Sequence, residues 1–428
     1  MAHDLVPKMS PYLDRHLVFP LLEFLQEKQV YPEEDILKAK IDLLGKTNMV
    51  DYGMDIHKAL YRTEDVPEEM LERRADVVER MRDLDEKAAP IIQFLQDPAH
   101  VDQLHPSDKA YNVQLLRERF NIGQDQIEAL YWYAKFQFEC GNYSGAAEFL
   151  YSYRQLSSDA DKSMSALWGK LAAAILMQKW EDALEDLNRL KEIIDSKAFT
   201  SPLSQLQQRT WLLHWSLFVF FNHENGNNLL IDMFFQEKYL NAIQQNAHHL
   251  LRYLATAVIL NKRRRQLVMR ELMKVIQQES YTYADPITQF LECLYIEYDF
   301  EGAQQKLKEC EEVLANDYFI GSVRGELMDN ARNYIFETYC KIHQCLDTKI
   351  LSEKLSLSPE DAERWIVNLI RQSRLEAKID SKAGTVIMTN PHPSVYEQII
   401  EKTKSLTARS FQLATNVTAA AAAQKAGI

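Results

Sequence analysis

The residues of this chain that could ligate a metal or act as nucleophiles are concentrated in one short stretch. Cys340, His343 and Cys345 lie within six positions of one another, and thiolate and imidazole are ligands that zinc prefers. At helical spacing Cys340 and His343 share a face, whereas Cys345 lies too far round the helix to join them. Because no second cluster supplies further ligands, we interpret the cysteines as core thiols and predict no metal site. A metal-dependent hydrolase stays the weakest alternative.

Other signatures of catalysis are missing from the sequence. His248 and His249 are adjacent, and neighbours on a helix point about 100° apart, so they cannot chelate one ion together. The sequence has no Walker A loop, no GxGxxG, no HExxH and no GxSxG elbow. We therefore predict no catalytic residue and no cofactor, and expect that the protein is not an enzyme.

One basic cluster stands out, formed by Lys262, Arg263, Arg264 and Arg265. It could contact RNA, dock an acidic partner or direct nuclear import. An exposed helix end carrying solvated cations explains it equally well.

The composition narrows the fold class. The chain has 428 residues and a net charge of −13, which argues against a surface that grips nucleic acid throughout. Gly (12) and Pro (13) are scarce, about half of their usual share. Because Gly and Pro form most tight turns, their scarcity indicates few turns and long helices. We predict a mainly α protein of two or three domains.

Cysteine usage and hydropathy indicate a cytoplasmic protein, and a nuclear location stays an alternative. The five cysteines are odd in number, widely spaced and form no CxxC, as is typical of reduced thiols. The N-terminal apolar run contains Pro20 and Glu23 and does not resemble a signal peptide. The longest uncharged run, residues 210–223, is shorter than the roughly 20 residues of a membrane span. It predicts a buried helix and no membrane contact.

A packing pattern recurs along the chain. An aromatic residue, two intervening residues, an Ala, three intervening residues and a Leu follow one another, as at the second helix of a tetratricopeptide hairpin. The small Ala would let the partner helix approach closely. We predict a right-handed stack of helix pairs, with packing at Tyr143 and Ala146, Trp180 and Ala183, and Phe300 and Ala303.

The pattern changes after about residue 349. A short helix is followed by a capped amphipathic helix and then by two strands, residues 377–380 and 385–388, joined by a turn in which Gly384 can take a positive φ. This order is that of a winged helix. Its core and interface are predicted to use Leu351, Leu355, Trp365, Ile366, Leu369, Ile370, Ile379, Val386, Ile387 and Met388.

Charge argues against DNA binding by this winged helix. Eight cations and seven anions lie between Lys341 and Asn390. Glu360, Asp361 and Glu363 open the would-be recognition helix, where carboxylates repel phosphates. We therefore expect a protein partner and no duplex DNA, while a winged-helix nucleic-acid-binding regulator stays an alternative.

A last amphipathic helix is predicted over residues 394–413, after a Pro-His-Pro break. Its apolar side carries Tyr396, Ile399, Ile400 and Leu406. We expect this helix to leave the winged helix and find its own partner, and expect residues 414–428 to form a frayed tail.

A helical array that leads into a winged helix and a free C-terminal helix resembles the PCI family, the scaffold subunits of the proteasome lid, the signalosome and translation initiation factor 3. Strings along the chain are similar to the e-subunit family of eukaryotic translation initiation factor 3. These strings are DRHLVFPLLEFL (14–25), YAKF (133–136), GNYSGAAE (141–148), QQRTW (207–211), HWSLFVFFNH (214–223), KVIQQESYTY (274–283) and ERWIVNLIR (363–371).

The resemblance implies a non-catalytic scaffold. Members of the PCI family associate side by side through their winged helices and gather their C-terminal helices in a bundle. By that resemblance the partners would be sibling subunits, c, d and l among them, and, through the assembly, the small ribosomal subunit, with weak RNA contact left open. A PCI subunit of the proteasome lid or signalosome stays the nearest alternative.

The expected domain organisation follows from these features. It comprises an N-terminal helical-repeat region (1–204), the helical part of a PCI domain (205–345), the winged helix (346–392), the C-terminal helix (393–413) and the tail (414–428).

Overall fold

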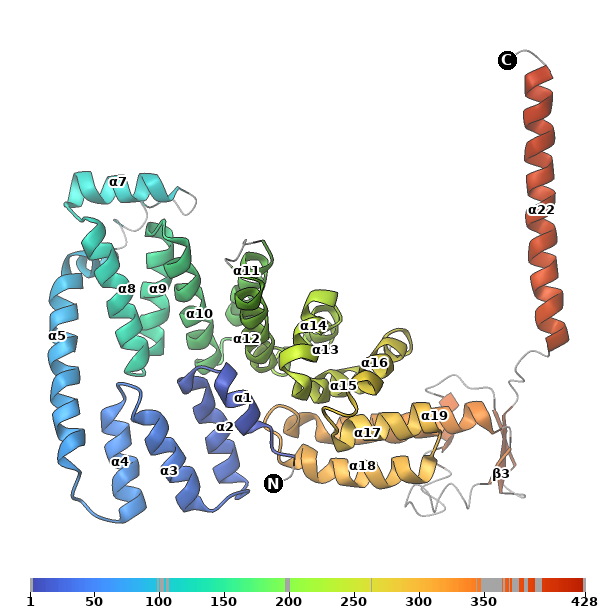
Figure 1. Ribbon diagram of the computed structural model, residues 1–428, viewed down its shortest axis with the longest axis horizontal. Coiled ribbons are helices and arrows are strands. Elements are labelled where there is room, and N and C mark those ends of the chain that lie inside the picture. Colours follow the sequence, from blue (N-terminus) through green and yellow to red (C-terminus); the bar gives the residue numbers. More distant parts are fainter. Residues whose placement is uncertain are drawn as a thin grey trace. The chain divides into compact units, whose positions relative to one another are not determined.

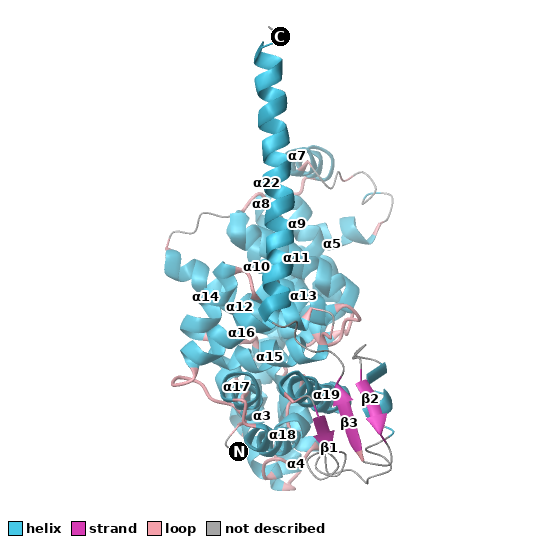
Figure 2. Cartoon of the chain, turned by 90° about the vertical axis from the view of Figure 1, so that its right-hand side faces the viewer, coloured by secondary structure: helices cyan, strands magenta, loops and turns pink. Residues whose placement is uncertain are grey.

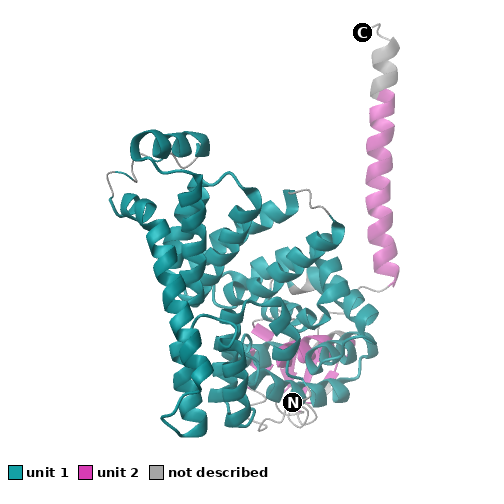
Figure 3. Cartoon of the chain, turned by 60° about the vertical axis from the view of Figure 1, so that its left-hand side comes forward, with its two compact units in different colours: residues 1–330 teal, residues 331–428 magenta. Residues whose placement is uncertain are grey.

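The computed structural model is almost entirely helical (Figure 1). It describes residues 3–97, 100, 104, 108–196, 201–262, 264–343, 345–347, 364, 366–368, 370–371, 377–380, 384–388 and 395–425. Two compact units divide the chain, Met1–Asn330 and Ala331–Ile428, and Figure 3 colours them separately. The division falls inside one helix, α19 (Arg324–Ile342).

The first unit is built from short and medium helices in succession. The N-terminal group comprises α1 (Val6–Met9), η1 (Ser10–Tyr12), α2 (Arg15–Glu27), α3 (Glu33–Leu44), α4 (Val50–Tyr61) and α5 (Glu68–Gln96). The middle group comprises α7 (Lys109–Phe120), α8 (Gln124–Glu139), α9 (Tyr143–Leu156), α10 (Ala160–Leu176), α11 (Trp180–Ser196) and α12 (Pro202–Phe220). The last group comprises α13 (Gly226–Phe234), α14 (Glu237–Asn246), η2 (His248–Leu250), α15 (Leu251–Leu260), α16 (Arg265–Glu279), α17 (Pro286–Glu292), η3 (Cys293–Glu297), α18 (Phe300–Ala315) and η4 (Gly321–Val323).

Consecutive helices of this unit pack against one another. Helices α8 to α12 contact in sequence order, and α5 lies along α8. Figure 1 shows α8, α9 and α10 side by side, with α2, α3 and α4 as a second row beneath them. The predicted stack of helix pairs is confirmed.

The recurring aromatic–Ala–Leu pattern coincides with helix starts. Tyr143, Trp180 and Phe300 are the first residues of α9, α11 and α18. The three alanines that follow, Ala146, Ala183 and Ala303, are completely buried. A methyl group at each position lets the neighbouring helix approach, because a longer side chain would hold the two backbones apart.

The uncharged run 210–223 forms most of α12, as predicted. Every residue from Leu212 to Phe220 is buried, so this helix lies in the centre of the first unit. Its start is capped by Ser201, whose Oγ accepts a hydrogen bond from the Ser204 amide at 3.2 Å. Asp285 caps α17 in the same way, ahead of Pro286.

The second unit contains a small antiparallel sheet (Figure 2). Its strands are β1 (Cys345–Asp347), β2 (Ala377–Asp380) and β3 (Thr385–Met388), and β3 lies between the other two. Ile379 is paired with Val386, and Leu346 is paired with the same residue from the other side. The predicted hairpin is present, and Gly384 has φ +65°.

Two features of this unit differ from the sequence prediction. Strand β1 was missed, since three residues are too few to display alternation, and Cys345 therefore lies on a strand rather than a helix. Helix α22 runs from Val395 to Lys425, whereas its end was predicted at Leu413. The alanine-rich segment continues the helix because alanine has the highest helix propensity.

Candidate interaction surfaces

The sheet of the second unit has one face against a small core and one face exposed. Val386 of β3 is fully buried and packs with Ile366 and with Phe336 and Cys340 of α19. Ile387 points to the other side, as alternation along a strand requires, and is 47% exposed. The hairpin therefore presents an apolar side chain outward.

The other residues predicted for the winged helix are placed as follows. Ile370 and Ile379 are partly buried and pack against the same core. Met388 ends β3. Leu351, Leu355, Trp365 and Leu369 lie outside the described residues.

Among the described residues of the second unit, none covers helix α22. Every side chain from Val395 to Thr418 is exposed. Tyr396, Ile399, Ile400 and Leu406, the residues predicted to form its apolar side, are 79%, 54%, 53% and 62% exposed. Water therefore surrounds a face that hydrophobic side chains would ordinarily bury.

The apolar face of α22 continues past the segment predicted from the sequence. Tyr396, Ile399, Leu406, Leu413 and Val417 follow the alternating three- and four-residue spacing of a coiled-coil seam, interrupted by a threonine and a serine. Phe411 and Leu413 are 75% and 68% exposed. The 31-residue helix is about 46 Å long at 1.5 Å per residue. A seam of this length suits a bundle of helices.

The basic cluster is partly neutralised. Arg264 Nη1 lies 2.6 Å from Asp232 Oδ1, and both side chains are largely exposed. Lys262 is exposed. Arg263 lies outside the described residues, and Arg265 begins α16. The structure thus leaves Lys262 as the described side chain of the cluster most accessible to an acidic or RNA partner.

The cysteines do not assemble a site. Burial raises the pKa of Cys340 to about 12 and that of Cys140 to about 11, which keeps both thiols protonated. Cys345 is exposed on β1. Among the described residues no three side chains of His, Cys, Asp or Glu gather closely enough to hold a metal ion.

The adjacent histidines contact different partners, as their helical geometry requires. His248 Nε2 lies 3.2 Å from Glu279 Oε2. His249 Nε2 is 2.8 Å from His214 Nε2, inside the first unit, and the ring of Tyr12 stacks on His214 at 4.5 Å. Burial lowers the pKa of His214 to about 4 and that of His249 to about 2, so both imidazoles are neutral near pH 7.

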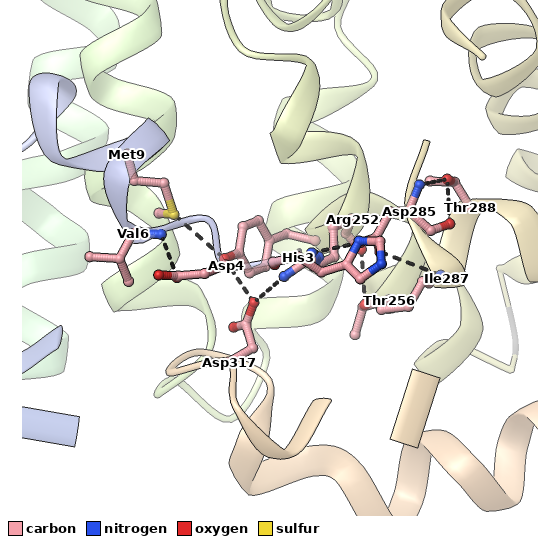
Figure 4. Close-up of polar contacts among 11 residues, drawn as sticks. His3, Asp4, Val6, Met9, Arg252, Thr256, Asp285, Ile287, Thr288 and Asp317 are labelled. Atoms are coloured by element: carbon pink, nitrogen blue, oxygen red, sulfur yellow. Dashed lines mark hydrogen bonds and ion pairs between the residues drawn. The ribbon is translucent and has the colours of Figure 1, made fainter. Parts of the chain in front are cut away.

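A buried ionic network lies in the first unit and was not predicted from the sequence (Figure 4). Arg252 of α15 is 2% exposed and pairs with Asp285 at 2.6 Å and with Asp317 at 3.0 Å. Its Nη2 also donates to the carbonyl of His3 at 2.8 Å, and Tyr253 Oη donates to Asp317. Burial opposes the charge on Arg252, but the two carboxylates raise its pKa well above the ordinary value. The one sequence signal was a lone arginine inside the apolar run 250–260.

This network fastens the start of the chain to the middle of the first unit. Leu5 and Met9 are buried, Trp215 Nε1 donates to the carbonyl of Tyr12 at 3.1 Å, and Tyr253 Oη contacts Met9 Sδ at 3.5 Å. Segments more than 200 positions apart are thereby joined.

Within the described parts of the chain, no helix combines the length and the apolar character that crossing a membrane would require.

Comparison with known families matches three segments of the chain. Residues 4–137 match the model described as eIF3 subunit 6 N terminal domain, and residues 307–390 match the PCI domain. Residues 394–414, within α22 and just before it, match the model of the C-terminal region of the E subunit of eukaryotic translation initiation factor 3.

Relatives from distant eukaryotes span nearly the same length. The chain is 61% identical over 422 residues to the E subunit of eukaryotic translation initiation factor 3 from Arabidopsis thaliana, covering 96% of this chain and 95% of that relative. It is 49% identical to the protein of that name in Aedes aegypti (96% and 94% covered) and 46% identical to that of Aspergillus fumigatus (97% and 93% covered). On this identity and coverage, the chain belongs to the E-subunit family of eukaryotic translation initiation factor 3.

Proposed function

We propose that this chain is a non-catalytic scaffold subunit of eukaryotic translation initiation factor 3. It joins sibling PCI subunits, c, d and l among them, and through that assembly supports binding to the small ribosomal subunit in the cytoplasm. The exposed apolar seam of α22 carries the proposal. A helix of 31 residues whose side chains from Val395 to Thr418 are exposed in the isolated chain gains most of its stability from packing with other helices.

The sheet supplies a second contact. Among the described strands β1 and β2 are the outer ones, and the outer edge of a sheet is where a strand of another protein of the assembly would pair. Ile387 adds an exposed apolar side chain beside them. Membership in the initiation-factor family favours this assembly over the proteasome lid or signalosome.

A matched pair of triple variants tests the role of α22. I399D/L406D/L413D places three carboxylates on the apolar seam. Q398D/S405D/Q412D places the same three carboxylates one residue earlier, about 100° round the helix and off the seam. Tagged chains are expressed in cells, purified, and the accompanying proteins and small-subunit RNA are quantified.

We expect the seam variant to lose most of the sibling subunits and the control to retain them. Equal recovery from both variants would show that α22 is not the contact. Recovery of proteasome-lid or signalosome subunits by the unaltered chain, in place of initiation-factor subunits, would overturn the proposed assembly.

A further inference from the structure

A solvent-open groove lies in the first unit, and every residue that lines it belongs to that unit. Its volume is about 690 Å³, within the range of about 300–1,000 Å³ typical of ligand clefts. One wall is α2, with contributions from Tyr52 of α4, the turn between α10 and α11, and Phe218 of α12. Figure 1 shows α2 beneath the lower end of α10.

The walls of the groove are rich in aromatic rings. Phe24 and Tyr318 meet edge to face at 5.6 Å, and Phe19 and Tyr52 do so at 6.3 Å. Trp180 also lines the groove and is partly exposed. Such faces accept apolar side chains and also the flat guanidinium of arginine. The ammonium of Lys28, the C-cap residue of α2, already lies 5.7 Å from the centroid of the Phe24 ring.

Two carboxylates line the groove. Glu23 and Glu27 lie one helical turn apart on α2, and both are exposed. The charge of Glu23 also acts on Lys40, whose pKa burial lowers and Glu23 raises. The field of Glu23 reaches Tyr52 on one wall and Tyr318 on the other, since it contributes, after burial, to the raised pKa of both phenols. The groove is thus acidic as well as aromatic.

A buried imidazole contributes an unpaired polar atom. His16 is 3% exposed, lines the groove, and holds its Nδ1 2.8 Å from Asp14 Oδ1. Its Nε2 is buried and has no hydrogen-bond partner in the described structure. A buried polar atom without a partner is costly, so a ligand group that forms a hydrogen bond with Nε2 would be stabilised by it.

We infer that this groove binds a short segment of a partner protein that carries an arginine beside an apolar side chain. The arginine would form a bidentate pair with Glu23 or Glu27 and stack on a neighbouring ring, and the apolar side chain would fill the space between Phe19, Tyr52 and Trp180. Nucleic acid does not fit, because the two carboxylates would face phosphates. The inference does not rest on the assembly proposed above, since no residue of the groove belongs to the second unit.

Peptide selection tests this inference directly. Short random peptides displayed on phage are selected on the immobilised full chain, and the enriched peptides are synthesised with a fluorescent label for anisotropy titrations. Binding is compared with E23K/E27K and with E79K/D83K, which makes the same charge change on two exposed residues of α5 at the same spacing. Circular dichroism confirms that each variant remains helical.

Enriched peptides are expected to contain arginine next to an apolar residue, and E23K/E27K should weaken their binding at least about tenfold, while E79K/D83K leaves it unchanged. Failure to enrich any peptide, enrichment of acidic peptides, or equal binding to all three chains would overturn the inference.

Discussion

Arg252 Nη2 lies 2.6 Å from Asp285 Oδ1, and the two side chains are 2% and 1% exposed although 33 positions separate them. A charge removed from water this completely depends on its counter-ions, because the interior offers no other solvation. The pair therefore links α15 to the start of α17 and, through Asp317 and the His3 carbonyl, to the loop after α18 and the chain's first residues.

Replacing Asp285 by Asn should destabilise the first unit strongly. Asparagine still caps α17, so the loss reports the missing charge rather than the cap. We expect the free energy of unfolding to fall by up to about 3–5 kcal/mol, the usual range for breaking a buried ion pair, because Arg252 would keep only Asp317 as a charged partner. Urea unfolding followed by circular dichroism measures it. Asp232→Asn, which breaks the exposed pair with Arg264, should cost less than about 1 kcal/mol, and an equal loss in both variants would contradict this account.

Acid should destabilise the first unit through the buried pair His214 and His249. Their native pKa values are lowered, chiefly by burial, below the unfolded value of about 6.5. The unfolded chain then binds more protons than the native chain below about pH 6.5. The free energy of unfolding therefore has its full value above about pH 6.5 and decreases as the pH falls toward about 4. Urea midpoints measured across this range should decline less steeply in His249→Gln. A decline as steep as that of the unaltered chain would rule out this pair as its source.

Enlarging Ala146 should disrupt the packing of α9 against its neighbours. The side chain is completely buried, so Ala146→Leu forces extra volume into a filled helix contact at a cost of about 1–3 kcal/mol. Thermal unfolding of the full chain should show a lower midpoint. Glu148→Leu, on the exposed side of the same helix, serves as the control, and a comparable shift there would refute the packing explanation.

Thiol alkylation should distinguish Cys345 from Cys340. Cys345 is exposed on β1, whereas Cys340 is buried and its pKa is raised by that burial. Brief iodoacetamide treatment of the native chain, followed by peptide mass spectrometry, should modify Cys345 first. If β1 lies in an interface with a sibling protein, Cys345 should become protected in the purified assembly. Equal modification of the two residues in the free chain would contradict the observed burial.

Several features were predictable because they depend on local chemistry. Scarce Gly and Pro indicated helices, the uncharged run 210–223 indicated the central helix α12, and the aromatic–Ala–Leu spacing located the starts of α9, α11 and α18. The β2–β3 hairpin was predictable because a turn containing Gly384 separates two short segments with the length and side chains of strands. The apolar side of α22 followed from its periodicity alone.

Other features depend on residues that meet only after folding. The sequence by itself determined the helical stack, the hairpin and the absence of a recognisable catalytic motif, since composition, period and spacing are local properties. The tertiary structure decided that Cys345 joins a third strand, that Arg252 is neutralised by Asp285 and Asp317, and that Glu23 and Glu27 share a groove with Trp180 and Tyr318. No local pattern encodes these contacts, because each arises from packing between helices or strands far apart in the chain, where burial changes what a charge or a thiol can do.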